Sequence, residues 1–284
     1  GWKKRRSDLH GLLPVLTDDA KYALQGELAE HFKQSESRGE SCEIIQESRA
    51  DGRHYWFASL ADTWQTVENV DEEGRHDLLM IRPTFEVVFV YNPRDYTLAI
   101  RGLRKRQHIT AMQQAFGRAQ LKRDLPEDKV EDVYNLNRLV EPLMAGADEF
   151  PFTTDVNDHV RSMRVKSIRY KVRQSVFPRV TLESHGMPTR RLFDDLRRHL
   201  VSDDADWGDI DIDYATFEVI FDDQTPVYKG PRSFYISGKR TCDLKFDERD
   251  LVLHGLLKKW GIDVSEDVDD DPDGGRATDL QCVF

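Results

Sequence analysis

The sequence predicts an α+β protein built from two tandem antiparallel-sheet modules, each with a C-terminal helix packed on its sheet. The chain has 284 residues, about twice the usual length of one domain. In addition, residues 84–89 (Thr-Phe-Glu-Val-Val-Phe) recur almost unchanged at 216–221 (Thr-Phe-Glu-Val-Ile-Phe). Both copies are followed by Ile-x-Gly, by basic residues and by a helix-like stretch that ends in an aromatic residue and glycine. This shared order indicates an internal duplication.

The predicted domains are residues 1–146, 155–262 and an acidic tail over 263–284, with a linker at 146–154. The tail holds eight acidic residues and one basic residue, a charge of −7, which leaves −4 of the total −11 for the rest of the chain. Such an Asp-rich, apolar-poor segment is predicted to be disordered. Because the body is only mildly acidic, its charge does not exclude a polyanionic partner.

The first module is predicted to start with a helix over 18–34, since Thr17 can act as its N-cap and apolar residues recur at helical spacing. Asp51-Gly52 between two strand-like runs is a strong hairpin signal. Each face of the aromatic run His54–Phe57 is expected to be core. The remaining elements are strands over 42–49, 53–59, 63–70, 78–81, 84–91 and 96–101, a helix over 106–121, and a helical connector near 127–143.

The second module shows alternating charge on two predicted strands. Arg169, Lys171 and Arg173 alternate along 164–174, and aspartates alternate at the start of 209–222. We expect a cross-strand ion ladder between them. In an uninterrupted strand, the face that carries these aspartates would also carry the core residues further along. We therefore expect a bulge or bend near Ala215. The other predicted elements are a strand over 179–183, a helix over 188–201, one or two strands over 233–246 and a helix over 247–260.

Two clusters of basic residues each follow a glycine at a predicted strand end. A glycine there lets the backbone approach a ligand closely, and arginine or lysine can meet its phosphates. The plainer interpretation is that the glycines turn the chain and the bases pair with local acids. From these clusters we predict a non-enzymatic binding protein. It would contact nucleic acid, or a nucleic-acid-handling partner, through both glycine-basic clusters. The residues are Arg101, Arg104, Lys105 and Arg106 after Gly102, and Lys239 and Arg240 after Gly238.

A metal-dependent nuclease is the alternative from another class. Asp243 and Lys245 form an acid-x-Lys pair on a predicted strand, and Glu218 lies upstream. Such residues can hold Mg²⁺ beside a phosphate, so Mg²⁺ would be needed only under this hypothesis. No nucleotide-binding, hydrolase or zinc-ligand motif is present in the sequence, and no other metal or cofactor is predicted.

The third hypothesis is an assembly protein whose sheets form homo-oligomer contacts. The three cysteines lie far apart, which favours a reducing cytoplasm. No apolar run reaches membrane-spanning length, so no membrane is predicted. The basic start, Lys3-Lys4-Arg5-Arg6, faintly resembles a signal peptide, but the apolar stretch after it is short and broken by His10 and Pro14.

Overall fold

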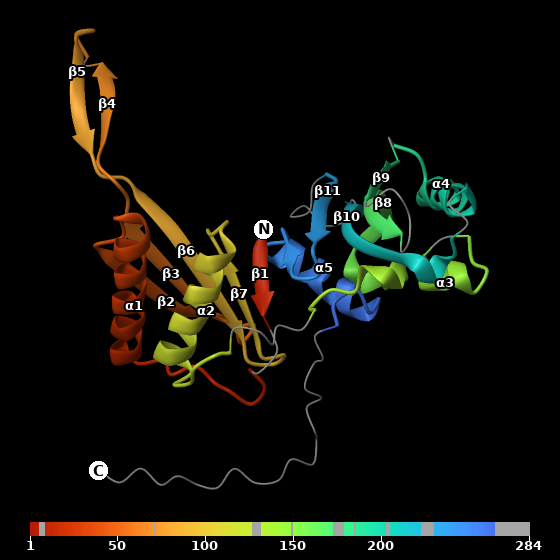
Figure 1. Cartoon of the computed structure of the whole chain (residues 1–284), viewed down its shortest axis with the longest axis horizontal. Helices are drawn as coiled ribbons and strands as arrows, with labels where there is room; N and C mark the ends of the chain where they lie inside the picture. The colour runs from red at the N-terminus through yellow and green to blue at the C-terminus, as the bar shows by residue number, and fades with distance from the viewer. Residues whose placement is uncertain are drawn as a thin grey trace, which may run out of the picture.

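The structure, a computed structural model, describes residues 1–5, 9–70, 72–126, 132–148, 150–172, 179–184, 186–202, 205–222 and 230–264. It has the predicted α+β class, but one antiparallel sheet of ten strands runs through both halves of the chain (Figure 1). The strand order is β2-β3-β6-β7-β1-β12-β11-β10-β8-β9. A separate two-stranded sheet, β4-β5, projects from the body. The two predicted modules therefore share one continuous sheet.

The first half packs two helices on one face of its strands. Thr17 caps α1 (Asp18–Glu36) by accepting a hydrogen bond from the Ala20 backbone, as its position predicts. Leu24, Leu28 and Phe32 of α1 enter a core that also holds Trp56 and Phe116. Helix α2 (Arg106–Gln120) lies beside α1. The strands are β2 (Cys42–Ser48), β3 (His54–Ala61), β6 (Thr84–Asn92) and β7 (Thr97–Arg101).

The second half builds its own core from Ile168, Phe217, Phe234 and Leu257, among others. Its strands are β8 (Val160–Val172), β9 (Val180–Glu183), β10 (Ile210–Phe221), β11 (Arg232–Ser237) and β12 (Thr241–Cys242). Its α-helices are α3 (Glu141–Met144), α4 (Thr189–Ser202) and α5 (Glu248–Lys259). Short 3-10 turns occupy Leu136–Leu139, Val156–Asp158 and Trp207–Asp209.

The two halves are joined by β1 (Trp2–Arg5), a strand at the start of the chain. Its residues pair with β7 on one side, as in Lys3 with Ile100, and with β12 on the other, as in Trp2 with Cys242. Directly paired residues of antiparallel strands share a face. Ile100 belongs to the core beneath α1 and α2, whereas Cys242 belongs to the core of the second half. The two cores therefore lie on opposite faces of one sheet.

This arrangement gives the predicted duplication no support. Both segments do place antiparallel strands before a helix, two in β6-β7-α2 and three in β10-β11-β12-α5. However, the strand order is mirrored about the β1–β12 boundary, and the helices pack on opposite faces. Because β10 also runs antiparallel to β6, the two units have opposite handedness. Two units of opposite hand do not superpose as copies of one fold.

The predicted helical connector near 127–143 is not a continuous helix where the structure describes it, and residues 127–131 lie outside the described ranges. Tyr134 instead forms an isolated β-bridge with Asp263. The backbone nitrogens of Val133 and Tyr134 both donate to the Lys239 carbonyl. These tertiary hydrogen bonds replace the helical ones, and Asn135 then caps a short 3-10 turn.

The charge pattern of β8 and β10 is confirmed in part. The pairing shifts register between Ile212 and Tyr214, which is the interruption expected near Ala215. Asp213 sits at this bulge and accepts from Arg169 Nε at 2.6 Å. Arg173 and the tail from 265 lie outside the described residues.

The separate hairpin, which we call the arm, consists of β4 (Gln65–Val70) and β5 (His76–Ile81). Register places Met80 and Leu78 on one face and Ile81 and Leu79 on the other. Leu78 is 71% exposed and Met80 66% exposed. The arm thus carries apolar side chains on both faces, outside the cores that the described residues form. Among the described residues, no helix is long and apolar enough to cross a membrane.

Charged groups are buried where the two halves meet. Lys4 Nζ lies 3.0 Å from Asp263 Oδ2, and Lys258 Nζ lies 3.0 Å from Asp95 Oδ2. Beside them, the buried His254 ring stacks on Phe246 and donates from Nε2 to the Lys245 carbonyl. Its Nδ1 has no hydrogen-bond partner in the described part of the chain. Burial and the nearby positive charge of Lys4 hold the pKa of His254 well below its ordinary value.

We therefore expect stability to fall on acidification. Unfolded His254 binds a proton below about pH 6.5, and the folded state excludes that proton. The free energy of unfolding should thus decrease as pH falls below about 6.5, by up to about 1.4 kcal/mol per pH unit from this residue. Urea denaturation between about pH 7.5 and pH 5 measures it. His254→Met should flatten the slope, whereas His10→Gln, at an exposed position, should keep it. An equal slope in His254→Met and the unaltered protein would contradict the assignment.

Candidate anion-binding cleft

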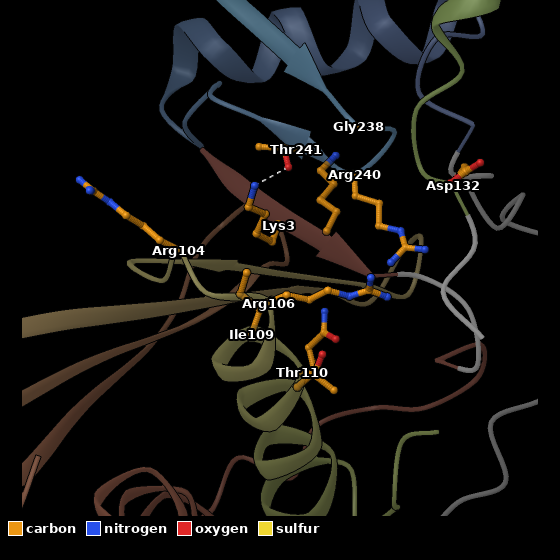
Figure 2. Close-up of a pocket in the computed structure, with 11 residues that line it drawn as sticks. Lys3, Arg104, Arg106, Ile109, Thr110, Asp132, Gly238, Arg240 and Thr241 are labelled. Atoms are coloured by element: carbon orange, nitrogen blue, oxygen red, sulfur yellow. Dashed lines mark hydrogen bonds between the residues drawn. The ribbon is translucent and has the colours of Figure 1, made fainter. Parts of the chain in front are cut away.

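Basic residues from three separate segments meet in a cleft of about 410 Å³ where the two halves join. We call it the basic cleft and define it by Lys3, Arg104, Arg106 and Arg240. Figure 2 shows Arg106 reaching from the start of α2 toward the turn that carries Arg240, while Arg104 extends on the other side of Lys3. Thr110 and Gln113 of α2 add polar groups to its wall.

Strand β1 supplies the lysine because alternate residues of a strand point to opposite faces. Lys3 faces the side of α2, where its Nζ donates to Thr241 Oγ1 at 2.6 Å. Lys4 points through to the other face, where it pairs with Asp263. Burial lowers the pKa of Lys3, so its ammonium is less stable in this cleft than in water. A bound anion would offset that penalty.

The start of α2 adds a second source of positive potential. Lys105 occupies the N-cap without a side-chain cap hydrogen bond, and the first turn contains no acidic residue. Its free backbone N–H groups and the helix dipole favour an anion at this end. Arg104 and Arg106 make no ion pair with any residue in the described ranges. Their charges therefore add to the helix potential, although the start of α2 also holds Glu36 against Lys105 and His108, and Asp132 lines the same cleft.

Arg240 approaches other guanidinium groups. Burial lowers its pKa first, and the positive charges of Arg106 and Arg5 lower it further, although Asp132 acts in the opposite direction. Arg5 is fully buried and donates to Gln113 Oε1 at 3.3 Å and to the Pro126 carbonyl at 2.7 Å. Like charges repel, so the potential near Arg106 and Arg240 favours an anion.

Three of the sequence-predicted basic residues point elsewhere. Lys105 pairs with Glu36 at 2.6 Å, and Lys239 pairs with Asp132 at 3.1 Å. The hydrogen bond from Lys105 helps lower the pKa of Glu36 to about 2. Arg101 lies on the opposite face of the sheet, over the Trp2 ring. For Lys105 and Lys239 the plainer interpretation, local pairing with acids, describes what the structure shows.

Both glycines serve turns, and Gly238 also lines the basic cleft. Gly102 has φ +101°, and a Cβ there would lie 2.1 Å from the Glu86 carbonyl oxygen. It is therefore needed for close packing against β6. Gly238 has φ +57°, a Cβ there would meet no described atom within 4 Å, and its N–H donates to the Asp213 carbonyl at 2.7 Å. It permits the left-handed turn between β11 and β12.

The two acidic residues of the nuclease hypothesis, Glu218 and Asp243, are engaged with other groups of the protein. Glu218 is held by Arg164 at 2.7 Å and by Lys166 at 3.3 Å. Burial would raise the pKa of Glu218, but these hydrogen bonds outweigh it and leave the pKa lowered. Asp243 accepts from the Tyr235 backbone at 2.6 Å, and Lys245 follows β12 instead of lying on it. The described ranges contain no group of three His, Cys, Asp or Glu residues that could hold a metal ion.

Sequence reasoning missed Lys3, Arg5 and Gln113. The run Lys3-Lys4-Arg5 was available as a signal, but a basic cluster at the start of a chain carries no information about which strands it will join. Comparison with protein-family models, with curated proteins and with solved structures found no match to this chain. The cleft itself therefore carries the functional argument.

The two glycines should respond differently to alanine. Gly238→Ala should lower the free energy of unfolding by about 1–2 kcal/mol, the cost of a left-handed backbone for a residue with a Cβ. Gly102→Ala should cost more, because the Glu86 carbonyl must also move. Urea denaturation compares the two variants. Equal losses would show that the contact with Glu86 has no energetic consequence.

Proposed function

We propose that this protein is a non-enzymatic binding protein that holds the phosphates of a nucleic-acid strand in the basic cleft. The observation that supports this function is that Lys3, Arg104, Arg106 and Arg240 line one concave site, in which Arg106 and Arg240 point toward each other (Figure 2). Arginine and lysine side chains form charge-assisted hydrogen bonds with phosphate oxygens. Phosphate contacts dominate the affinity of proteins for nucleic acids.

The shape of the site favours a single strand. Proteins that read a duplex insert a protruding helix or ribbon into a groove. Here the basic side chains lie inside a cleft of about 410 Å³, within the usual size of a small-ligand site. An extended strand can place a few phosphates in such a cleft, whereas a duplex is too wide to enter it. Thr110 and Gln113 can donate further hydrogen bonds to the backbone.

Arg106→Gln should weaken binding of a twelve-residue oligothymidylate and make it less sensitive to salt. Each phosphate held contributes a slope of about −0.7 in a plot of log affinity against log salt for single strands. Loss of one contact should therefore reduce the magnitude of the slope by about 0.7. Fluorescence anisotropy over a salt series measures both quantities.

Lys105→Gln is the matched control for this experiment. It removes one positive charge from the adjacent position, but that charge is paired with Glu36 outside the cleft. Its affinity and slope should stay close to those of the unaltered protein. Equal effects of Arg106→Gln and Lys105→Gln would show that net charge matters and the cleft does not. No binding by the unaltered protein would overturn the proposal.

The assembly hypothesis is the second candidate function, and the arm favours it. The run Leu78-Leu79-Met80-Ile81 places apolar residues on both faces of β5, a pattern typical of a strand that is buried on both sides. A two-stranded ribbon is marginally stable alone, and its outer edges can pair with another strand. A second copy of the chain supplies such a strand by symmetric pairing of two arms.

If the arms pair, the average mass in light scattering should rise with protein concentration. Leu78→Lys combined with Met80→Lys should return the monomer mass, because both charges lie on one face of the arm. Val201→Lys, at a site on α4 that is 77% exposed, is the control and should not change the mass. A constant monomer mass in the unaltered protein would exclude assembly through the arm.

A further inference from the structure

A second cavity, of about 240 Å³, lies on the face of the sheet opposite α1 and α2. We call it the aromatic pocket and define it by Trp2, Tyr55, Phe57 and Phe246. Phe57 and Phe246 are only partly buried, whereas Tyr55 and Trp2 are buried beneath the opening. Among the described residues, this face of the first half carries a small apolar layer. The helices of the first half, α1 and α2, pack on the other face. The expectation that both faces of the aromatic run are core is therefore met at Trp56 and Tyr55, but not fully at Phe57.

The rings around this pocket are arranged in pairs. Tyr55 and Phe57 are nearly parallel, with centroids 6.0 Å apart and an angle of 10° between their planes. Trp2 and Phe246 meet edge to face at 4.8 Å. The indole nitrogen of Trp2 is buried and makes no hydrogen bond with the described residues. Flat π faces suit a planar ring more than an aliphatic chain.

Two arginines complete the lining. The Arg49 guanidinium lies 4.1 Å from the centroid of the Tyr55 ring, and that of Arg101 lies 5.9 Å from the centroid of Trp2. Neither forms an ion pair with a residue in the ranges that the structure describes. Glu86, Lys245 and Asp247 also line the cavity, and the Asp247 carboxylate caps α5 by accepting from the Asp250 backbone. The site therefore combines aromatic faces with cations and acceptors, which together match a base and its attached phosphate.

The aromatic pocket and the part of the basic cleft that holds Lys3 and Arg104 both lie at the start of β1, whereas Arg106 and Arg240 lie toward the other end of this strand (Figure 2). Trp2 and Lys3 are neighbours in β1 and point to opposite faces, one into each site. Arg101 ends β7 on the side of the pocket, and after the turn at Gly102 the chain brings Arg104 to the cleft. A nucleic-acid strand that passes round the start of β1 can therefore contact both sites.

We infer that the aromatic pocket binds a base of a single-stranded nucleic acid, stacked on Phe57, while the basic cleft holds its phosphates. This inference rests on the proposed function, because it assigns the base to the same strand. Stacking on an aromatic side chain accepts any base, so the pocket adds affinity for nucleic acid over other polyanions and not sequence specificity.

The test compares two probes with the same backbone charge: a twelve-residue oligothymidylate and an abasic oligonucleotide of equal length. Phe57→Leu keeps an apolar side chain in the pocket but removes the π face. It should weaken binding of the oligothymidylate about tenfold and leave binding of the abasic strand unchanged. Tyr22→Leu, which removes an exposed aromatic residue of α1, should change neither.

The outcomes separate the two proposals. If the unaltered protein binds both probes equally, or if Phe57→Leu binds oligothymidylate normally, the pocket has no role and the cleft remains. If neither probe binds, both proposals fail. A second measurement covers a Phe57 variant that does not fold: an oligothymidylate with a central 2-aminopurine should lose fluorescence when it binds the unaltered protein, since the base stacks on a ring. Binding without this loss overturns the inference.

Discussion

The structure depends on the hydrogen bonds of β1, a strand of four residues that joins two half-sheets. It pairs with β7 on one side and with β12 on the other, so the sheet is continuous only while both ladders are intact. The strand also sets the chemistry of the junction. Lys3 enters the basic cleft, Lys4 pairs with Asp263 and Trp2 forms part of the aromatic pocket. One short segment thus determines both the continuity of the sheet and the position of both candidate sites.

The placement of the two cores on opposite faces explains why a cleft forms here. On the face of α1 and α2, the second half presents polar residues such as Thr216 and Tyr235 instead of a core. The start of α2 therefore borders a region that no second-half helix in the described residues covers on that face. Arg106 and Arg240 meet across this uncovered region. The basic clusters after Gly102 and Gly238 lie close together because β1 pairs with the strands on both sides. Their proximity does not require an internal duplication.

The elements that local signals specify could be predicted from the sequence. The N-cap at Thr17, the turn at Asp51-Gly52 and the interruption near Asp213 each depend on residues close in the chain. The pairing of β1 could not be predicted, because its partners, residues 98–100 and 241–242, are far away in sequence. The prediction of a helical connector was wrong for the same reason. Tyr134 makes backbone contacts with Lys239 and Asp263, which are far away in sequence, instead of helical hydrogen bonds. The candidate site was predicted at Arg104, Arg106 and Arg240, and it was missed at Lys3.

The arm differs from the rest of the molecule in local stability. In the ten-stranded sheet, a ladder can open only if neighbouring strands or packed side chains are also disturbed. In the arm, the cross-strand pairs run from Gln65 with Ile81 to Val70 with His76. No third strand lies beside them among the described strands. Their amides can exchange with solvent through openings that leave the core of Trp56 and Phe116 intact. The backbone hydrogen bonds of the arm should therefore open more readily than those of the ten-stranded sheet.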